Sequence, residues 1–245
     1  MRLESDLAEP ETTKQYSEWF ASIRPYKGSR SRSLFSAYFK RNYLPHLADA
    51  RNDRIVELGC GSGEFLSFLQ EHNFANVRAI DLDVEHVRQA GQYGYPVAQA
   101  DLFDFLPTLD DHSVDVLVMN DLIEHIPRER VIGLMEVIHS KLAGDGRFVV
   151  KTCNCNSPYG LSTFFSDFTH VEGYTPQKLG HLAAMTGFTE CKPYNVFICP
   201  GLGILDDLYT LPFRLNYRIK RLFFKINGKA ADGVFSKNFL AVLRP

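Results

Sequence analysis

The stretch Ile55–Phe65, which reads IVELGCGSGEF, decides the fold. A short apolar run ends at Leu58, and the glycines Gly59, Gly61 and Gly63 follow at every second position before a helical segment begins. Glycine tolerates positive φ angles and has no Cβ to obstruct a ligand that approaches the backbone. The pattern therefore predicts a strand, a tight turn and a helix, with the turn open to a ligand.

This glycine pattern departs from the dinucleotide-binding fingerprint. In G-x-G-x-x-G the third glycine would stand where this chain has Glu64. Glu57 also stands immediately before the turn, where a carboxylate would repel a pyrophosphate. The same carboxylate suits the ammonium and sulfonium charges of S-adenosylmethionine, so the motif favours a cationic ligand over a dinucleotide.

From residue 51 onward, short apolar runs alternate with amphipathic segments, which is the pattern of a parallel α/β sheet. The run VDVLVMN at 114–120 is typical of a strand buried on both faces. The pattern predicts strands at residues 54–58, 77–80, 97–99, 114–119, 146–152 and 237–243. It predicts helices at residues 64–71, 84–91, 128–142 and 175–186.

The residues before position 51 and the segment before the last strand do not follow this α/β pattern. Residues 1–50 lack strand character, and segments 15–20 and 34–47 indicate an N-terminal helical extension that we expect to cap a substrate. We expect residues 51–245 to form the main domain, in which 201–233 is a helical insertion before the last strand. The stretch from Cys153 to Tyr174 has the composition of a loop.

Composition narrows the functional classes. The chain has 245 residues, 45% of them hydrophobic, and a formal net charge of −2, which favours one well-packed domain over disorder. Five cysteines without a C-x-x-C spacing exclude a zinc ribbon or a thioredoxin-type motif and suit a reducing compartment. We see no run typical of a signal peptide or a spanning helix, so we expect a cytoplasmic protein.

The segment 51–188 resembles the class I S-adenosylmethionine-dependent methyltransferases, whose first motif reads like Ile55–Phe65. The resemblance implies an α/β fold with a Rossmann-like, seven-stranded, mostly parallel sheet and helices on both faces. It also implies that Glu57 and the three glycines of the turn bind S-adenosylmethionine.

Acids after the next two strands complete the cofactor site that the resemblance implies. Asp81, followed by Leu82, stands where an acid binds the ribose diol. Asp101 stands where an acid meets the adenine amino group, and the amide of Leu102 would meet the ring. Asn120, at the end of the fourth strand, joins this set. A turn or helix-cap role is the alternative for both aspartates.

The segment after the fourth strand carries a candidate metal site. If Asp121, Glu124 and His125 lie in a helical turn, their positions i, i+3 and i+4 share one face. Two carboxylates and an imidazole suit Mg²⁺, Mn²⁺ or Fe²⁺ rather than a structural zinc. His170, in the loop after the fifth strand, would supply a fourth ligand.

This set resembles the E-x-x-E-H plus His arrangement of small-RNA 2′-O-methyltransferases and of ubiquinone-pathway O-methyltransferases, although Asp121 stands where they have Glu. If the enzyme uses no metal, His125 or His170 would be the general base, because an unperturbed imidazole titrates near neutral pH. A structural role for these histidines is the third reading. The absence of N-P-P-[YF] after the fourth strand favours O-methylation over N-methylation.

The stretch 167–188 resembles methyltransferases of bacterial surface-polysaccharide (O-antigen) clusters, which act on sugars. This implies a hydroxyl of a glycan or lipid-linked sugar as the acceptor, with Asp167 and Tyr174 as acceptor contacts. Arg30 and Arg32 are candidates to clamp a carboxylate or phosphate of the acceptor.

Two basic runs lie at 24–41 and 214–229. The second predicts a helix with one basic face and one apolar face, made by Tyr217, Ile219, Leu222, Phe223 and Ile226. Such a helix can lie on the anionic inner face of a membrane, or it can pack on the sheet with its cations in water.

Three alternatives to a glycan O-methyltransferase follow from the same sequence. An RNA 2′-O-methyltransferase or a small-molecule O-methyltransferase could use the same acid and histidine set. The pI near 6.4 weighs against a nucleic-acid partner. A non-catalytic binding protein that keeps only the cofactor fold is the third alternative.

Overall fold

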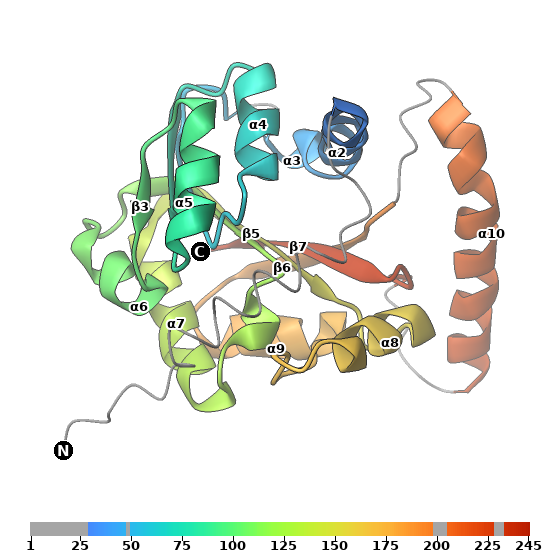
Figure 1. Ribbon diagram of the computed structural model, residues 1–245. Helices are drawn as coiled ribbons and strands as arrows, with labels where there is room; N and C mark the ends of the chain where they lie inside the picture. The colour runs from blue at the N-terminus through green and yellow to red at the C-terminus, as the bar shows by residue number, and fades with distance from the viewer. Residues whose placement is uncertain (1–28, 48–49, 198–204, 228–232) are drawn as a thin grey trace.

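The computed structural model describes residues 29–47, 50–197, 205–227 and 233–245 (Figure 1). A seven-stranded sheet in the order β3-β2-β1-β4-β5-β7-β6 forms its centre. All strand pairs are parallel except β5 with β7 and β7 with β6, so the predicted mostly parallel α/β sheet is confirmed. The strands are β1 (Arg54–Leu58), β2 (Asn76–Asp81), β3 (Val97–Gln99), β4 (Val114–Asn120), β5 (Leu142–Cys153), β6 (Glu190–Asn195) and β7 (Asn238–Arg244).

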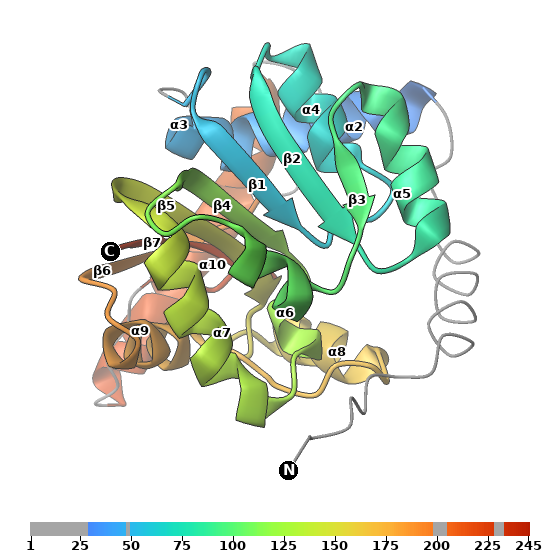
Figure 2. The same cartoon turned by 90° about the vertical axis from the view of Figure 1, so that its left-hand side faces the viewer.

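Helices cover both faces of the sheet (Figures 1 and 2). One face carries α2 (Ser29–Asn42), α3 (Leu44–Leu47), α4 (Glu64–Glu71) and α5 (Val84–Ala90), and the other carries α6 (Leu102–Phe105), α7 (Arg128–Lys141) and α9 (Pro176–Met185). The short 3₁₀ turns η1 (Gly91–Tyr93), η2 (Leu106–Thr108) and η3 (Ile123–His125) join these elements.

Alternation along the central strands divides the core into two layers. In β1, Ile55 packs in the layer under α2 and α4, whereas Val56 and Leu58 pack in the layer under α7. In β4, Val118 and Met119 alternate in the same way. Successive side chains of a strand point to opposite faces, so apolar runs without polar interruption are what a doubly covered sheet needs.

The N-terminal helices belong to this core. Phe39, Tyr43 and Leu47 are buried in the same layer as β1 and α4. The ring centroids of Phe39 and Tyr43 lie 5.1 and 5.2 Å from that of Phe65 in α4, close to the edge-to-face spacing that aromatic pairs prefer. The predicted extension is therefore helical where it is described, and it packs as part of the domain. The helix expected at 15–20 lies outside the described residues.

Three features differ from the sequence pattern. The stretch expected as a loop contains α8 (Pro158–Ser166), which begins with proline at its first position, as helices tolerate. The pattern does not locate β6, because this strand carries Pro193 and few apolar residues and lies at the edge of the sheet. The fifth strand begins at Leu142, four residues before the predicted start.

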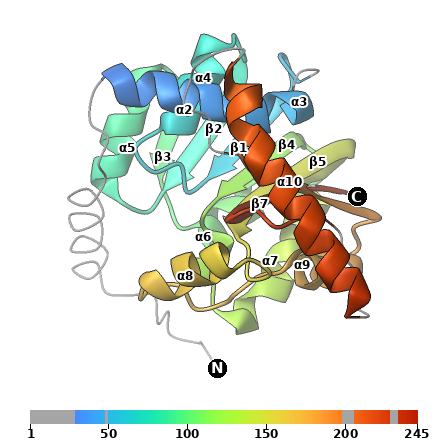
Figure 3. The ribbon, with the colours of Figure 1, turned by 90° about the vertical axis from the view of Figure 1, so that its right-hand side faces the viewer.

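The insertion before the last strand forms α10 (Leu205–Ile226), which stands apart from both helical layers (Figure 3). Its ring contacts go to Phe197 and Phe235, and Lys220 lies over the ring of Tyr159 in α8. None of these three residues lies in a strand, so these contacts of α10 are with loops and with α8. Among the described helices, none combines the length and apolar content needed to cross a bilayer.

Candidate active site

The glycine turn has the predicted geometry. Gly59, Gly61 and Gly63 have φ angles of +70°, +53° and +86°. A Cβ on Gly63 would lie 2.9 Å from the Tyr93 ring, so this position needs glycine for packing as well as for conformation. A Cβ on Gly61 would meet nothing within 4 Å. Gly61 is therefore where a ligand can approach the backbone.

Glu57 places a buried carboxylate behind this turn. Glu57 is only 1% exposed, and its Oε1 accepts a hydrogen bond of 3.1 Å from Asn120 Nδ2. Oε2 has no hydrogen-bond partner among the described residues. Burial raises the pKa of Glu57 well above its ordinary value, and the charges of Glu64 and Asp81 raise it further. An ammonium group bound here would supply the missing partner, so the residue fits a cationic methyl donor.

Tyr43 holds this carboxylate in place through Asn120. The Tyr43 hydroxyl donates to Asn120 Oδ1 at 2.6 Å, and the other end of the same amide donates to Glu57. Tyr43 is fully buried between α2 and α3. Sequence reasoning missed Tyr43, because nothing local marks an aromatic residue of the N-terminal segment as a partner of a strand residue 77 positions away.

The Asp81 carboxylate accepts hydrogen bonds that stabilise the glycine turn. Its Oδ2 accepts from the Gly61 amide at 2.8 Å, and its Oδ1 accepts from the Asp83 amide at 2.9 Å and contacts His86 Nδ1 at 3.2 Å. A carboxylate offers about four acceptor positions. Asp81 therefore has the turn role that the sequence left as an alternative. Its carboxylate has about one acceptor position left, which allows one hydrogen bond from a ribose hydroxyl but not a bidentate pair.

Asp101 and its neighbours lie at the same edge of the sheet. Asp101 is the N-cap of α6 and accepts from the Phe103 amide at 2.7 Å, which is the cap role foreseen as the alternative. Leu102 begins this helix, and Leu82, after β2, is 46% exposed. The adenine contacts of Asp101 and Leu102 stay predictions.

Glu124 links η3 to the loop after α8. Its carboxyl accepts from Thr152 Oγ1 at 2.9 Å, and its backbone carbonyl accepts from the amides of Val171 and Glu172. The residue is 1% exposed. Burial raises the pKa of Glu124 to about 8, and the charge of Asp121 adds to this. Glu124 is therefore mostly an uncharged carboxylic acid near neutral pH.

His125 lies at the end of a hydrogen-bonded relay. The Thr169 hydroxyl donates to Asp167 Oδ1 at 2.6 Å and lies 2.9 Å from His125 Nδ1. Since the carboxylate can only accept, the hydroxyl proton goes to Asp167, and the hydroxyl oxygen accepts from Nδ1–H. The Thr169 carbonyl, 3.2 Å from Nδ1, requires the same tautomer. The proton-accepting nitrogen of His125 is therefore Nε2.

His170 packs against His125. The two ring centroids are 4.6 Å apart in an edge-on arrangement, and His170 Nδ1 lies 3.0 Å from the Phe164 carbonyl. Burial lowers the pKa of His125, and the neighbouring His170 lowers it further. A lowered pKa keeps the His125 imidazole neutral at pH 7, which is the form that accepts a proton.

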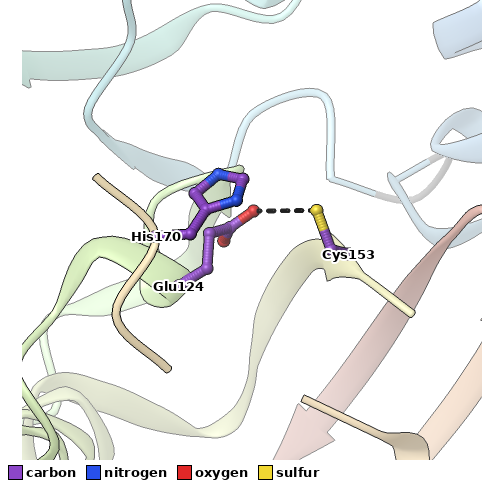
Figure 4. A group of neighbouring side chains, drawn as sticks. All are labelled: Glu124, Cys153 and His170. Carbon is purple, nitrogen blue, oxygen red and sulfur yellow. Dashed lines mark hydrogen bonds between the residues drawn. The ribbon is translucent and has the colours of Figure 1, made fainter. Parts of the chain in front are cut away.

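The structure does not assemble the predicted metal set. Asp121 has a φ of +49° and precedes η3, so the helical spacing assumed for residues 121, 124 and 125 does not apply. Its carboxylate pairs with Lys151 Nζ at 2.5 Å. In the described part of the chain, the donors close enough to share an ion are Glu124, Cys153 and His170 (Figure 4).

This group does not fit Mg²⁺ or Mn²⁺. Both ions prefer oxygen ligands, whereas a cysteine sulfur suits softer ions such as Zn²⁺. The Cys153 thiol lies 3.8 Å from Glu124 Oε1, as the dashed line in Figure 4 shows, and burial raises the pKa of this thiol. A cysteine sulfur is a poor ligand for a hard divalent cation.

The residues expected to contact the acceptor have other roles where they are described. Asp167 caps the turn to Thr169 through its side chain and orients the relay. Tyr174 is 1% exposed, which favours packing over the predicted acceptor contact. Arg30 and Arg32 lie in α2, but their side chains fall outside the described part of the structure.

Two cavities of the described structure are lined by residues other than the candidate acids. One of about 240 Å³ lies between α2, α4 and α5 and includes Ser62 of the glycine turn. The other, of about 480 Å³, lies against β6 and β7, where its lining includes Arg147, Lys192 and Arg244. Glu57, Asp81 and Asp101 line neither cavity. These acids stand instead at or near the carboxyl ends of β1, β2 and β3, where ligands of α/β folds bind.

Known proteins share this fold. A methyltransferase of Archaeoglobus fulgidus, described as S-adenosylmethionine-dependent, superposes with a TM-score of 0.67 at 20% identity and covers 93% of this chain and 99% of its own. A structure described as a DhpI-SAM-HEP complex superposes with a TM-score of 0.58 at 18% identity, with 96% and 97% covered. At these identities the likeness concerns the fold.

Sequence comparison adds a curated relative and a family. The ubiquinone biosynthesis O-methyltransferase of Neisseria meningitidis serogroup C (strain 053442) is 25% identical over 121 residues, which is 47% of this chain. The match spans half the length of that relative. The model of the family described as methyltransferase domain matches residues 26–190. This chain therefore belongs to the methyltransferase domain family.

Proposed function

We propose that this protein is an O-methyltransferase in which His125 removes the proton of the acceptor hydroxyl. The observation that carries the proposal is the relay from Asp167 through Thr169, which leaves Nε2 of a neutral His125 as the proton acceptor. A hydroxyl that attacks a methyl group must lose its proton, and a positioned base accelerates such steps by about 10² to 10⁴-fold.

The methyl donor would be held by residues of the glycine turn and of the strand ends. Glu57 Oε2 would accept from the ammonium group, Gly61 would present open backbone, and Asp81 would accept from one ribose hydroxyl. When bound, S-adenosylmethionine supplies a methyl group made electrophilic by the sulfonium charge. Asp101 and Leu102 are the proposed adenine contacts.

The proposed acceptor is a sugar hydroxyl of a bacterial surface polysaccharide or of a related lipid-linked glycan. The stretch 167–188 and the two basic runs support an anionic or glycan acceptor. A small hydroxylated molecule is the second candidate, because the curated relative is named for ubiquinone biosynthesis. An RNA 2′-hydroxyl is the third, and the pI near 6.4 weighs against it.

The proposed reaction does not depend on Mg²⁺ or Mn²⁺. The support is the donor chemistry: Asp121 is paired with Lys151, and Cys153 takes a place that an oxygen ligand would need. Activity that is lost in EDTA and restored by Mg²⁺ or Mn²⁺ would contradict this part of the proposal.

The test uses the purified protein, labelled S-adenosylmethionine and three acceptor panels: glycans, small phenols and RNA. We expect methyl transfer to a glycan hydroxyl, and His125→Ala should lower kcat by about 10² to 10⁴-fold with little change in donor KM. His181→Ala, at an exposed position of α9, is the matched control. Transfer to RNA or phenols alone would refute the glycan acceptor, and an unchanged kcat in His125→Ala would refute the base.

A further inference from the structure

The helix α10 carries a long apolar face that the described structure leaves in contact with solvent. Apart from one adjacent pair, Leu222 and Phe223, the members of this face recur every three or four residues, and each is between 52% and 71% exposed. They are Leu205, Leu208, Leu211, Leu215, Ile219, Leu222, Phe223 and Ile226. We refer to these eight side chains as the α10 stripe.

The stripe faces away from the rest of the molecule. The residues that hold α10 against the domain, Tyr217 and Phe224, lie on a different side of the helix and contact Phe197 and Phe235. Figure 3 shows α10 crossing in front of the sheet as an outer element. With 22 residues, it presents a rod about 33 Å long. A continuous exposed apolar face of this length indicates a binding surface.

The charges beside the stripe indicate what covers it. Every side chain that is charged at neutral pH from residue 208 to the end of α10 is basic. These are Arg214, Arg218, Lys220, Arg221 and Lys225. A second copy of the helix would place these cations against one another, so self-association through the stripe is opposed by like-charge repulsion. The complementary partner is an apolar surface with negative charge at its rim.

We propose that α10 binds the surface of an anionic lipid bilayer, lying parallel to the membrane with the stripe among the acyl chains and the cations among the headgroups. A surface helix with one apolar face and Lys and Arg on its polar side has this property. The sequence alone permitted a face of five residues. The structure corrects this face at Tyr217, whose ring packs on Phe197 on another side of the helix. It extends the other four residues into a face along the whole of α10, uncovered among the described residues. The proposal does not depend on the identity of the acceptor.

The test measures co-sedimentation of the full chain with vesicles of phosphatidylcholine alone and of equimolar phosphatidylcholine and phosphatidylglycerol. We expect binding to the anionic vesicles and much weaker binding to the neutral ones. The double variant Leu215→Asp, Leu222→Asp should abolish binding. The matched control, Ile132→Asp with Met185→Asp, changes two exposed apolar residues of α7 and α9 and should bind as the wild type does.

A second variant separates charge from apolar burial. Arg218→Gln with Lys225→Gln should weaken the partition onto anionic vesicles by about 25-fold, since each cation near such a surface contributes about fivefold. All variants change exposed positions, so an unchanged thermal midpoint and donor affinity would verify their fold.

Three results would overturn the proposal. The wild type could fail to bind anionic vesicles, or the Leu215 and Leu222 variant could bind them as well as the wild type does. Alternatively, the wild type could form a dimer in solution that the same variant disrupts, which would assign the stripe to a second copy.

Discussion

Replacing Glu124 by glutamine tests whether the buried carboxyl carries a proton. Burial raises the pKa of this group from 4.5 to about 8, so the folded chain keeps a proton there that the unfolded chain has lost. Stability falls with rising pH wherever the folded state binds more protons. The wild type should therefore lose about 1.4 kcal/mol per pH unit between these two values, and at most about 5 kcal/mol in total. Glutamine does not titrate and retains an acceptor for the Thr152 hydroxyl.

Urea unfolding of both proteins from about pH 5 to about pH 8 measures this effect. The free energies should be similar near pH 5, and the advantage of Glu124→Gln should grow as pH rises. Subtracting the two curves removes the other titrating groups. Glu136→Gln, at an exposed position of α7, should show no such trend. A difference that stays constant over this range would refute the argument that Glu124 is protonated.

Three further predictions concern the donor turn and the base. Glu57→Gln should weaken S-adenosylmethionine binding in calorimetry by about tenfold or more, because it removes a charge-assisted hydrogen bond. Equal affinity of the variant and the wild type would contradict the proposed contact of Glu57 Oε2 with the ammonium group. Gly63→Ala should lower the free energy of unfolding more than Gly61→Ala, because both add a Cβ at positive φ but only the first meets the Tyr93 ring; equal losses in urea would count against this. The kcat/KM profile should decline as pH falls through the lowered pKa of His125, below 6.5, because protonation removes the base; an inflection above pH 7 would exclude it.

Much of the fold was predictable from residues that are close together in the sequence. The glycine turn between β1 and α4 was predictable because three glycines behind an apolar run permit the positive φ angles of a tight turn, which other residues rarely adopt. The helix after Thr175 was predictable for a similar reason, since the Thr175 hydroxyl accepts from the Lys178 amide as an N-cap does. Such features depend on residues close in sequence.

The parts of the site that sequence reasoning missed depend on long-range packing. Tyr43 contacts Asn120 across the core, and Cys153 approaches Glu124 only because β5 lies beside β4. The prediction for Asp121 failed for a conformational reason, since a positive φ places this residue before η3 instead of within a helix. No periodicity in the sequence encodes these approaches.

The contact from Tyr43 to Asn120 has a consequence for protein engineering. Residues 29–47 donate a hydroxyl to the amide that orients Glu57, and they fill one apolar layer with aromatic rings. A shortened version that starts at residue 51, or a chimera that exchanges the first fifty residues with those of a relative, would disturb cofactor affinity even though every motif residue were retained. Variants meant to alter acceptor choice should therefore leave this tyrosine and the helices on either side of it intact.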